Sequence, residues 1–78
     1  MTKVKPLRGS YVVCLDCTDD DVDLLVGKLY RVAKSDRKDP ASMLRVIDES
    51  GEDYLYPASW FAPVPLTPKT KRALAAVI

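Results

Sequence analysis

The chain has 78 residues, and its 12 lysines and arginines almost balance its 11 aspartates and glutamates, which leaves a net charge of +1 at pH 7. A chain of this length forms one domain and buries only about three fifths of its unfolded surface. The balanced charge gives no overall attraction to nucleic acid or to an anionic membrane. Histidine, the commonest general base and metal ligand, is absent from the sequence. We therefore expect no enzyme activity, no metal site and no cofactor.

The first segment, residues 1–9, carries three basic side chains and little to bury, so we expect a loosely held arm. It lacks the apolar segment of a secretory signal, and no apolar run in the chain is long enough to span a membrane. We therefore expect a cytoplasmic protein whose two cysteines are reduced.

Five short runs rich in β-branched and aromatic residues predict β-strands. They lie at residues 11–15, 29–34, 43–48, 53–56 and 62–66. In the third run Leu44, Val46 and Asp48 share one face, because side chains alternate along a strand. Two prolines confine the last run to a sheet edge.

Two helical segments flank the last strand. Pro57 ends the fourth strand, and residues 58–61 predict a single helical turn. Thr67 followed by Pro68 is the preferred start of a helix, with threonine at the cap and proline at the first helical position. The apolar face of this helix either packs on the domain or is offered to a partner, and we expect packing, because so small a domain needs the added area. That face contains Leu74, Val77 and Ile78.

The order of these elements, with a long acidic loop after the first strand and a helical turn before the last, is typical of a small bent barrel. Residues 24–32 resemble the diverging turn and second strand of the SH3-like barrels. Residues 54–64 resemble the last two strands of that family and the 3₁₀ turn between them. The resemblance implies an all-β, five-stranded SH3-like barrel at residues 10–66, followed by a C-terminal helical tail at residues 67–78.

Peptide-binding SH3 domains hold a proline-rich ligand in an aromatic groove, beside an acidic loop that pairs with a basic ligand residue. Pro57 and Trp60 match the proline of that groove and the aromatic residue three positions later. The aspartates that match the acidic loop in character are Asp19, Asp20, Asp21 and Asp23. The chain departs from the family pattern in its first strand, which lacks the tyrosine motif, and at Met43 and Leu44, where the family has a tryptophan.

The rings near Trp60 have two interpretations. Tyr54 and Tyr56 share one face of their strand, and Leu55 takes the other. If Leu55 is in the core, both tyrosines are exposed and form a recognition surface with Trp60. If the tyrosines point inward, they belong to the core. We expect Leu55 and Phe61 to be inside and Trp60 to be partly exposed.

Cys14 and Cys17 form a CxxC motif beside the aspartates. Zinc needs four ligands, and the chain has no further cysteine or histidine, so only Asp16 or Asp19, or the thiolates of a second chain, could complete a site. Neighbouring carboxylates raise a thiol pKa, which disfavours a redox role. The aspartates lack the glycine and the closing glutamate of a calcium loop. We expect a packed Cys14, an incidental Cys17 and a solvated acidic loop that can receive a basic partner segment.

These features predict a non-catalytic interaction or regulatory module, a monomer that binds a peptide or protein segment. Its predicted binding residues are Trp60, Pro57, Tyr54, Tyr56, Asp19, Asp20, Asp21 and Asp23. The alternative is a small nucleic-acid-associated barrel that uses basic residues of the arm, one loop and the tail. Those residues are Lys3, Lys5, Arg8, Arg31, Lys34, Arg37, Lys38, Lys69, Lys71 and Arg72. The acidic loop and the balanced charge rank this alternative second.

Overall fold

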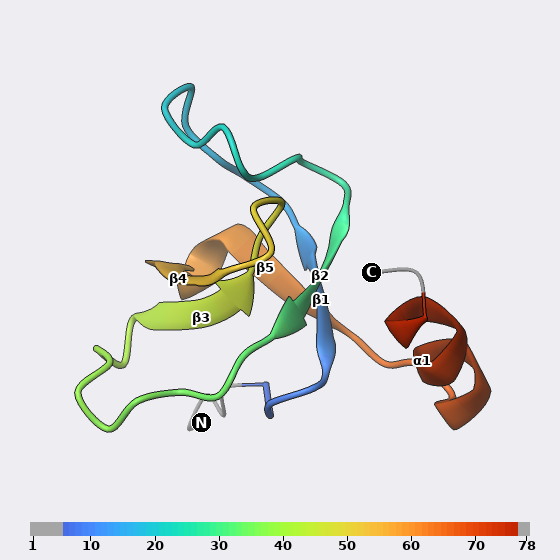
Figure 1. The fold of residues 1–78 in the computed structure, drawn as a ribbon. Coiled ribbons are helices and arrows are strands. Elements are labelled where there is room, and N and C mark those ends of the chain that lie inside the picture. The colour runs from blue at the N-terminus through green and yellow to red at the C-terminus, as the bar shows by residue number, and fades with distance from the viewer. Residues whose placement is uncertain (1–5, 77–78) are drawn as a thin grey trace.

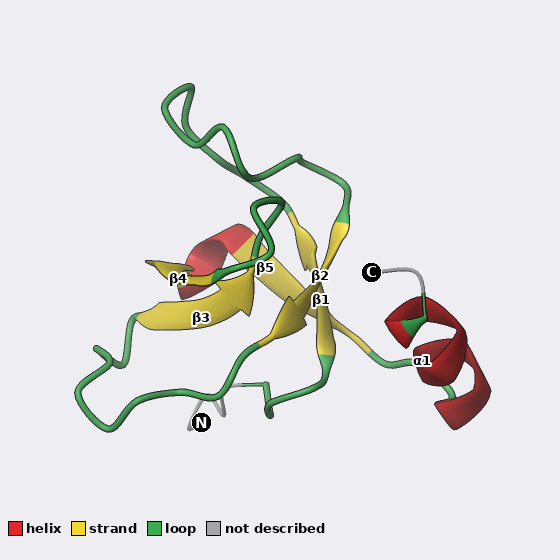
Figure 2. Ribbon diagram, in the orientation of Figure 1, coloured by secondary structure: helices red, strands yellow, loops and turns green. Residues whose placement is uncertain are grey.

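The structure, a computed structural model, describes residues 6–76, and its elements follow the predicted order (Figure 1, Figure 2). The strands are β1 (Tyr11–Cys14), β2 (Leu29–Val32), β3 (Met43–Ile47), β4 (Asp53–Pro57) and β5 (Phe61–Val64). A 3₁₀ turn, η1 (Ala58–Trp60), joins β4 to β5, and the helix α1 (Pro68–Ala75) follows β5. All five predicted strands and both helical segments are confirmed. Most of the predicted arm, including Lys3 and Lys5, lies outside the described residues.

The strands form one antiparallel sheet in the order β4-β3-β2-β1-β5. Strand β1 pairs with β2 on one side, where Val12 is opposite Tyr30, and with β5 on the other, where Cys14 is opposite Phe61. Strand β5 lies at an edge, as its proline content predicts. The other edge is β4, and no ladder joins β4 to β5 within the described residues. Hydrogen bonds therefore do not close the sheet into a barrel, and η1 is the direct chain connection between its two edges.

The core lies on one face of this sheet. Alternate residues of β2 and β3 are buried there, as the period of two predicts: Tyr30 with Val32, and Leu44 with Val46. The other buried apolar side chains come from β1, the following loop and the start of β5. They are Tyr11, Val12, Cys14, Leu24 and Phe61. Each strand except β4 thus contributes at least one buried side chain.

The register of β4 corrects the predicted position of Leu55. Leu44 is opposite Tyr56, and Arg45 is opposite Leu55. Directly opposed residues share a face of the sheet, so Tyr56 lies on the core face and Leu55 lies on the outer face with Arg45. The prediction that Leu55 is a core residue is therefore wrong, whereas the prediction for Phe61 is confirmed, since only 8% of that residue is exposed. A shift of β4 by one residue along β3 would exchange the faces of Leu55 and Tyr56, so the pairing with β3 decides which of them meets the core.

Helix α1 begins as predicted, and of its predicted apolar face only Leu74 lies within the described residues. Thr67 is the N-cap, and its hydroxyl accepts a hydrogen bond of 3.2 Å from the Thr70 backbone N–H. No residue of the helix is buried, and Leu74 is only half-buried. Figure 1 shows α1 beside the sheet, attached through the segment that follows β5. Val77 and Ile78 lie outside the described residues, and no helix within residues 6–76 has the length and apolar character needed to cross a membrane.

Candidate functional site

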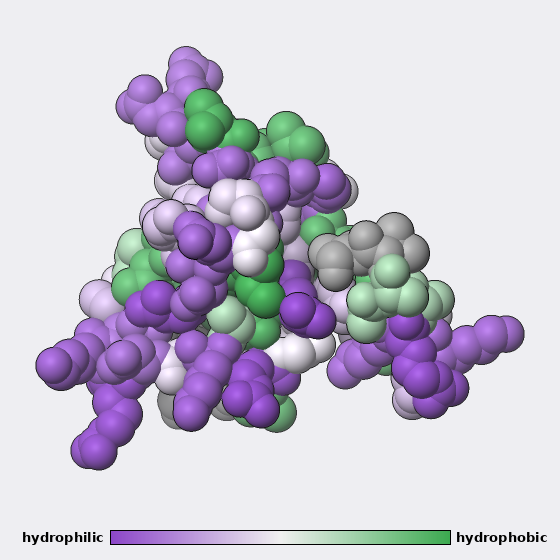
Figure 3. Space-filling view, viewed as in Figure 1, coloured by the Kyte–Doolittle hydropathy of each residue, from purple (hydrophilic) through white to green (hydrophobic). Residues whose placement is uncertain are grey.

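The loop between β1 and β2, residues 15–28, concentrates the exposed apolar surface. Four of its side chains are more than half exposed: Leu15 at 54%, Val22 at 81%, Leu25 at 52% and Val26 at 61%. Among the large apolar residues of the described chain, only two others, Leu7 and Tyr54, are exposed. In Figure 3, green apolar surface borders the purple tip of this β1–β2 loop at the top of the view. One loop therefore carries most of the accessible apolar side chains.

The β1–β2 loop is tied to the sheet at its base. The Gly27 N–H donates to the Cys14 carbonyl at 2.7 Å, and the Cys14 N–H donates to the Lys28 carbonyl at 2.9 Å. Gly27 has a φ of 87°, which favours glycine at this turn. Leu24 is buried in the core, with 3% of its surface exposed. The exposed apolar side chains are thus held on an ordered segment, and their exposure does not come from fraying.

A second tether reaches the far side of the loop. The buried hydroxyl of Tyr30 accepts a hydrogen bond of 2.8 Å from the Leu25 N–H. Burial raises the pKa of Tyr30 to about 12, so the hydroxyl stays neutral across the physiological range. Glu49, in the turn between β3 and β4, donates its N–H to the Asp23 carbonyl at 2.9 Å. Both ends of the stretch from Asp23 to Leu25 are thereby fixed.

Replacing Tyr30 by phenylalanine should loosen the β1–β2 loop without unfolding the domain. The change removes the acceptor of the Leu25 N–H and should cost about 1 kcal/mol of unfolding free energy. Amide hydrogen exchange followed by NMR should show faster exchange at Leu25, with the amides of β3 much less affected. Tyr54→Phe is the matched control, because that hydroxyl contacts only the exposed Glu52 carboxylate, at 3.1 Å. Equal exchange rates at Leu25 in the two variants would contradict the role of the Tyr30 hydroxyl in holding the loop.

The four predicted acidic residues differ in their exposure and in their hydrogen bonds. The Asp21 carboxylate accepts hydrogen bonds from the Thr18 hydroxyl at 2.6 Å and the Thr18 N–H at 3.0 Å, and these bonds lower the pKa of Asp21. Asp23 is half-buried. Asp19 and Asp20 are exposed, and neither carboxylate has a hydrogen bond or ion pair with another described residue. Asp21 shapes the loop, and Asp19 and Asp20 are the carboxylates available to a partner.

The predicted aromatic residues do not form one exposed patch. Trp60 and Tyr56 are half-buried against the core, with ring centroids 6.3 Å apart. Pro57 is also half-buried, and Tyr54 is exposed at 48%. Trp60 touches the β1–β2 loop through its backbone, since its carbonyl accepts the Leu15 N–H at 2.6 Å. The structure therefore places Trp60 beside the start of the loop and separates Tyr54 from the ring contacts of Tyr56 and Trp60.

Asp48 has a structural role that was not predicted from the sequence. It is the one charged residue that is buried within the described chain, with 5% exposed. Its carboxylate accepts hydrogen bonds from the Tyr56 hydroxyl at 2.6 Å and from the Ser50 N–H at 2.9 Å, together with the Ser50 hydroxyl. Burial alone would raise the pKa of Asp48, but these bonds outweigh it and hold the pKa below its ordinary value. The alternation of Leu44, Val46 and Asp48 in the sequence places Asp48 on the same face as two core residues, and this was the signal for its burial.

The two thiols have unequal surroundings. Cys14 is buried, and its thiol donates to the Asp16 carbonyl at 3.2 Å. Burial raises the pKa of Cys14, which leaves it a poor nucleophile. Cys17 is half-buried and packs against the core. No group of three or more cysteine or carboxylate side chains within residues 6–76 is placed to hold a metal ion.

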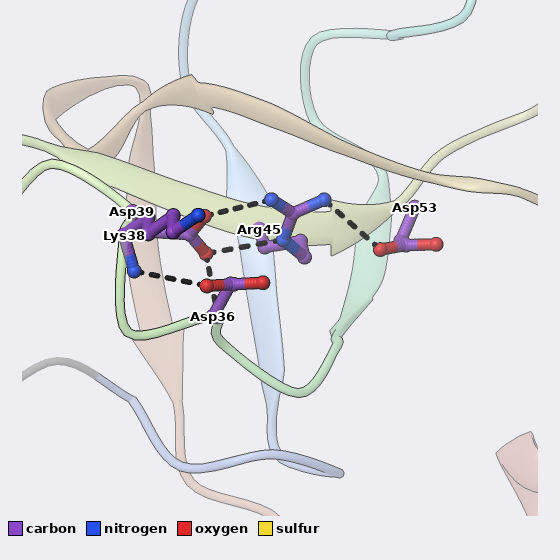
Figure 4. Close-up of polar contacts among 5 residues, drawn as sticks. All are labelled: Asp36, Lys38, Asp39, Arg45 and Asp53. Atoms are coloured by element: carbon purple, nitrogen blue, oxygen red, sulfur yellow. Dashed lines mark hydrogen bonds and ion pairs between the residues drawn. The ribbon is translucent and has the colours of Figure 1, made fainter.

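The loop between β2 and β3, residues 33–42, borders an open hollow of about 930 Å³. Figure 4 shows that Arg45, on its wall, is bound on two sides by carboxylates. Its guanidinium bonds both oxygens of Asp39, at 2.7 and 3.1 Å, and reaches Asp53 at 3.1 Å. These bonds raise the pKa of Arg45, with Asp39 the main cause. Arg45 thus braces the loop against β3 and β4 and is not available to an anion.

The β1–β2 loop offers a partner two kinds of contact, apolar side chains and the carboxylates of Asp19 and Asp20. Such a surface binds by burying apolar area, and its charge selects the partner. Part of this site was predicted, namely the acidic loop and the neighbouring Trp60. Its apolar residues were not. Comparison of the chain with protein families, with curated proteins and with solved structures finds no match.

Proposed function

We propose that this chain is an SH3-like barrel that acts as a protein-interaction module and binds a partner segment rich in basic and apolar residues. The binding surface is the β1–β2 loop together with the neighbouring edge of Trp60. The observation that carries the proposal is the gathering of Leu15, Val22, Leu25 and Val26 on one anchored loop. Apolar side chains that gather on an exposed surface mark interaction sites, whereas scattered ones do not. Asp19 and Asp20 add the negative charge that selects a basic partner.

The order of the elements and one contact support the SH3-like part of the proposal. The acidic loop lies between β1 and β2, and the 3₁₀ turn lies between β4 and β5, in the order that the resemblance implies. The bond from the Leu15 N–H to the Trp60 carbonyl brings that loop to that turn. The binding surface that we propose is centred on the loop, because Tyr56 and Trp60 are half-buried. We also place the protein in the cytoplasm, since both cysteines are free.

The proposed surface can be tested by titrating the isotope-labelled chain with a lysine- and leucine-rich peptide and following amide chemical shifts. Shifts should cluster on residues 15–28 and at Trp60. Val22→Ser should weaken binding about threefold to tenfold, because it removes exposed apolar area from the surface. Leu7→Ser is the matched control, since Leu7 is 78% exposed and Val22 is 81% exposed, but Leu7 lies outside the loop. A second peptide with glutamate in place of lysine should bind more weakly.

The result that would overturn the proposed surface is a titration without localised shifts on the loop. Equal weakening by Val22→Ser and Leu7→Ser would count equally against it, because the loop would then have no special role. Shifts that cluster around Lys34, Arg37 and Lys38 would favour a different surface.

The nucleic-acid alternative has less support from the arrangement of basic residues. Lys34, Arg37 and Lys38 are exposed at the hollow of the β2–β3 loop and make no ion pair with another described residue. Figure 1 shows α1 on the other side of the molecule from that loop, so the tail and the loop do not form one basic surface. Nucleic-acid binding needs cations placed along a continuous backbone. The protein-binding proposal therefore comes first.

A further inference from the structure

Charge is strongly segregated along this chain. No lysine or arginine occurs from Gly9 to Gly27, a stretch that contains five aspartates. No aspartate or glutamate occurs after Asp53. The cations of α1 are Lys69, Lys71 and Arg72. The same chain therefore carries an acidic, apolar loop and a basic helix, whose charges are complementary.

Helix α1 makes little contact with the rest of the described chain, and its Leu74 is half-buried. None of its residues is buried, although its start is capped by Thr67. Arg72 and Leu74 are two positions apart, which puts them about 200° apart around the helix axis and on nearly opposite sides. A helix of eight residues is marginal in water by itself, so packing of its apolar side would stabilise it. Lys71 is three positions before Leu74 and lies on the same side of the helix, so a basic and an apolar side chain are neighbours on the surface of α1.

The α1 helix of a chain is directed away from the β1–β2 loop of the same chain. The loop leaves β1 after Cys14, whose partner in β5 is Phe61. The helix follows the other end of β5, where Val64 pairs with Tyr11. Only three residues, 65–67, separate β5 from α1, and an extended residue spans at most about 3.6 Å. Figure 1 shows the loop and α1 well apart. In this structure the two segments of one chain lie apart, so a contact between them would join two molecules.

We propose that the β1–β2 loop of one chain binds α1 of a second copy, and that the reciprocal contact closes a two-fold dimer. This rests on the proposed function, because it names the partner of the same surface. In the dimer Leu74 faces the apolar side chains of the loop, and Lys71, three positions before Leu74 on the same side of the helix, faces Asp19 and Asp20. Lys69 adds to the positive charge of the helix. A two-fold axis makes both contacts equivalent, so neither surface is left unpaired. The monomer predicted from the sequence is replaced by a concentration-dependent dimer.

A charge-swap experiment tests this contact on the full chain. The loop variant is Asp19→Lys with Asp20→Lys, and the helix variant is Lys69→Glu with Lys71→Glu. All four side chains are exposed, and glutamates near the start of a helix favour it, so both variants should fold. Sedimentation velocity over roughly 10 to 500 μM should show dimerisation of the wild type, weakened by salt. Each variant alone should dimerise at least about tenfold more weakly.

The equimolar mixture of the two variants gives the decisive result. Each contact in the mixed dimer joins opposite charges, so dimerisation should return to within about threefold of the wild type. A monomeric wild type, a swap without effect or a mixture without recovery would overturn the inference. The peptide titration on the same samples distinguishes the dimer from the proposed function. A monomer whose loop still binds the lysine- and leucine-rich peptide refutes the dimer and keeps the proposed function, whereas loss of both results refutes both.

Discussion

Replacing Phe61 by alanine should remove a large part of the stability of the domain at 25 °C. The variant loses a buried ring and leaves a cavity, which costs about 3–5 kcal/mol for a phenylalanine. A domain of 78 residues has a free energy of unfolding of roughly 4–12 kcal/mol. The loss should appear as a fall in the urea midpoint and the thermal midpoint, followed by circular dichroism. If the stability of the wild type lies at the low end of that range, the variant is largely unfolded without urea, and its unfolding curve has no folded baseline.

The position of Phe61 explains why its effect should be so large. It is the first residue of β5, directly after η1, and its ring packs edge-on against Tyr56 at a centroid distance of 6.2 Å. No ladder joins β4 to β5 within residues 6–76, so side chains hold these two edges together. Tyr54→Ala is the matched control, since it removes an exposed ring of the same sheet and should cost far less. Similar losses from the two variants would contradict the role of Phe61.

The fold of this chain was largely predictable from local pattern. Leu44, Val46 and Asp48 alternate, and this alternation gives the buried face of β3. Glycine at a positive φ marks the turns at Gly27 and Gly51. The position of Leu55 was not predictable in this way. Two tyrosines flank it, so either face of β4 could be the buried one, and pairing with β3 decided between them.

The candidate site was predictable only in part, for a similar reason. The sequence indicates an acidic loop, but residues 15–28 are irregular and have no hydrophobic period from which exposure follows. Leu24 is buried and its neighbour Leu25 is exposed because the tether to Tyr30 fixes how the loop turns. A long-range contact of that kind leaves no local signal. The cap of α1 was predicted from Thr67 and Pro68, because capping is a local signal.

Replacing Asp48 by alanine should destabilise the domain by about 2–3 kcal/mol, because the Tyr56 hydroxyl and the Ser50 N–H both lose their acceptor. Ser50 can turn to water, since it is exposed, but Tyr56 is half-buried. The turn that Asp48 organises also holds the β1–β2 loop through the bond from Glu49 to Asp23. Urea unfolding measures the loss, and amide exchange at Glu49 should become faster. An unchanged urea midpoint would show that these bonds contribute nothing net.

The pH dependence of Asp48→Asn isolates the charge of this carboxylate. Asparagine keeps the shape and can still accept from Ser50 and donate to Tyr56, so it should cost less than alanine.

The folded pKa of Asp48 lies below its unfolded value of about 3.9, so ionised Asp48 stabilises the fold above that pH. The contribution is lost as the pH falls through the folded pKa. The pKa values of Asp21 and Glu49 are also lowered, and they act alike in both proteins. Urea unfolding from about pH 7 to about pH 2 should therefore show a difference between wild type and variant that is constant at neutral pH and shrinks below about pH 4. A difference that stayed the same throughout would mean that the charge of Asp48 does not stabilise the turn.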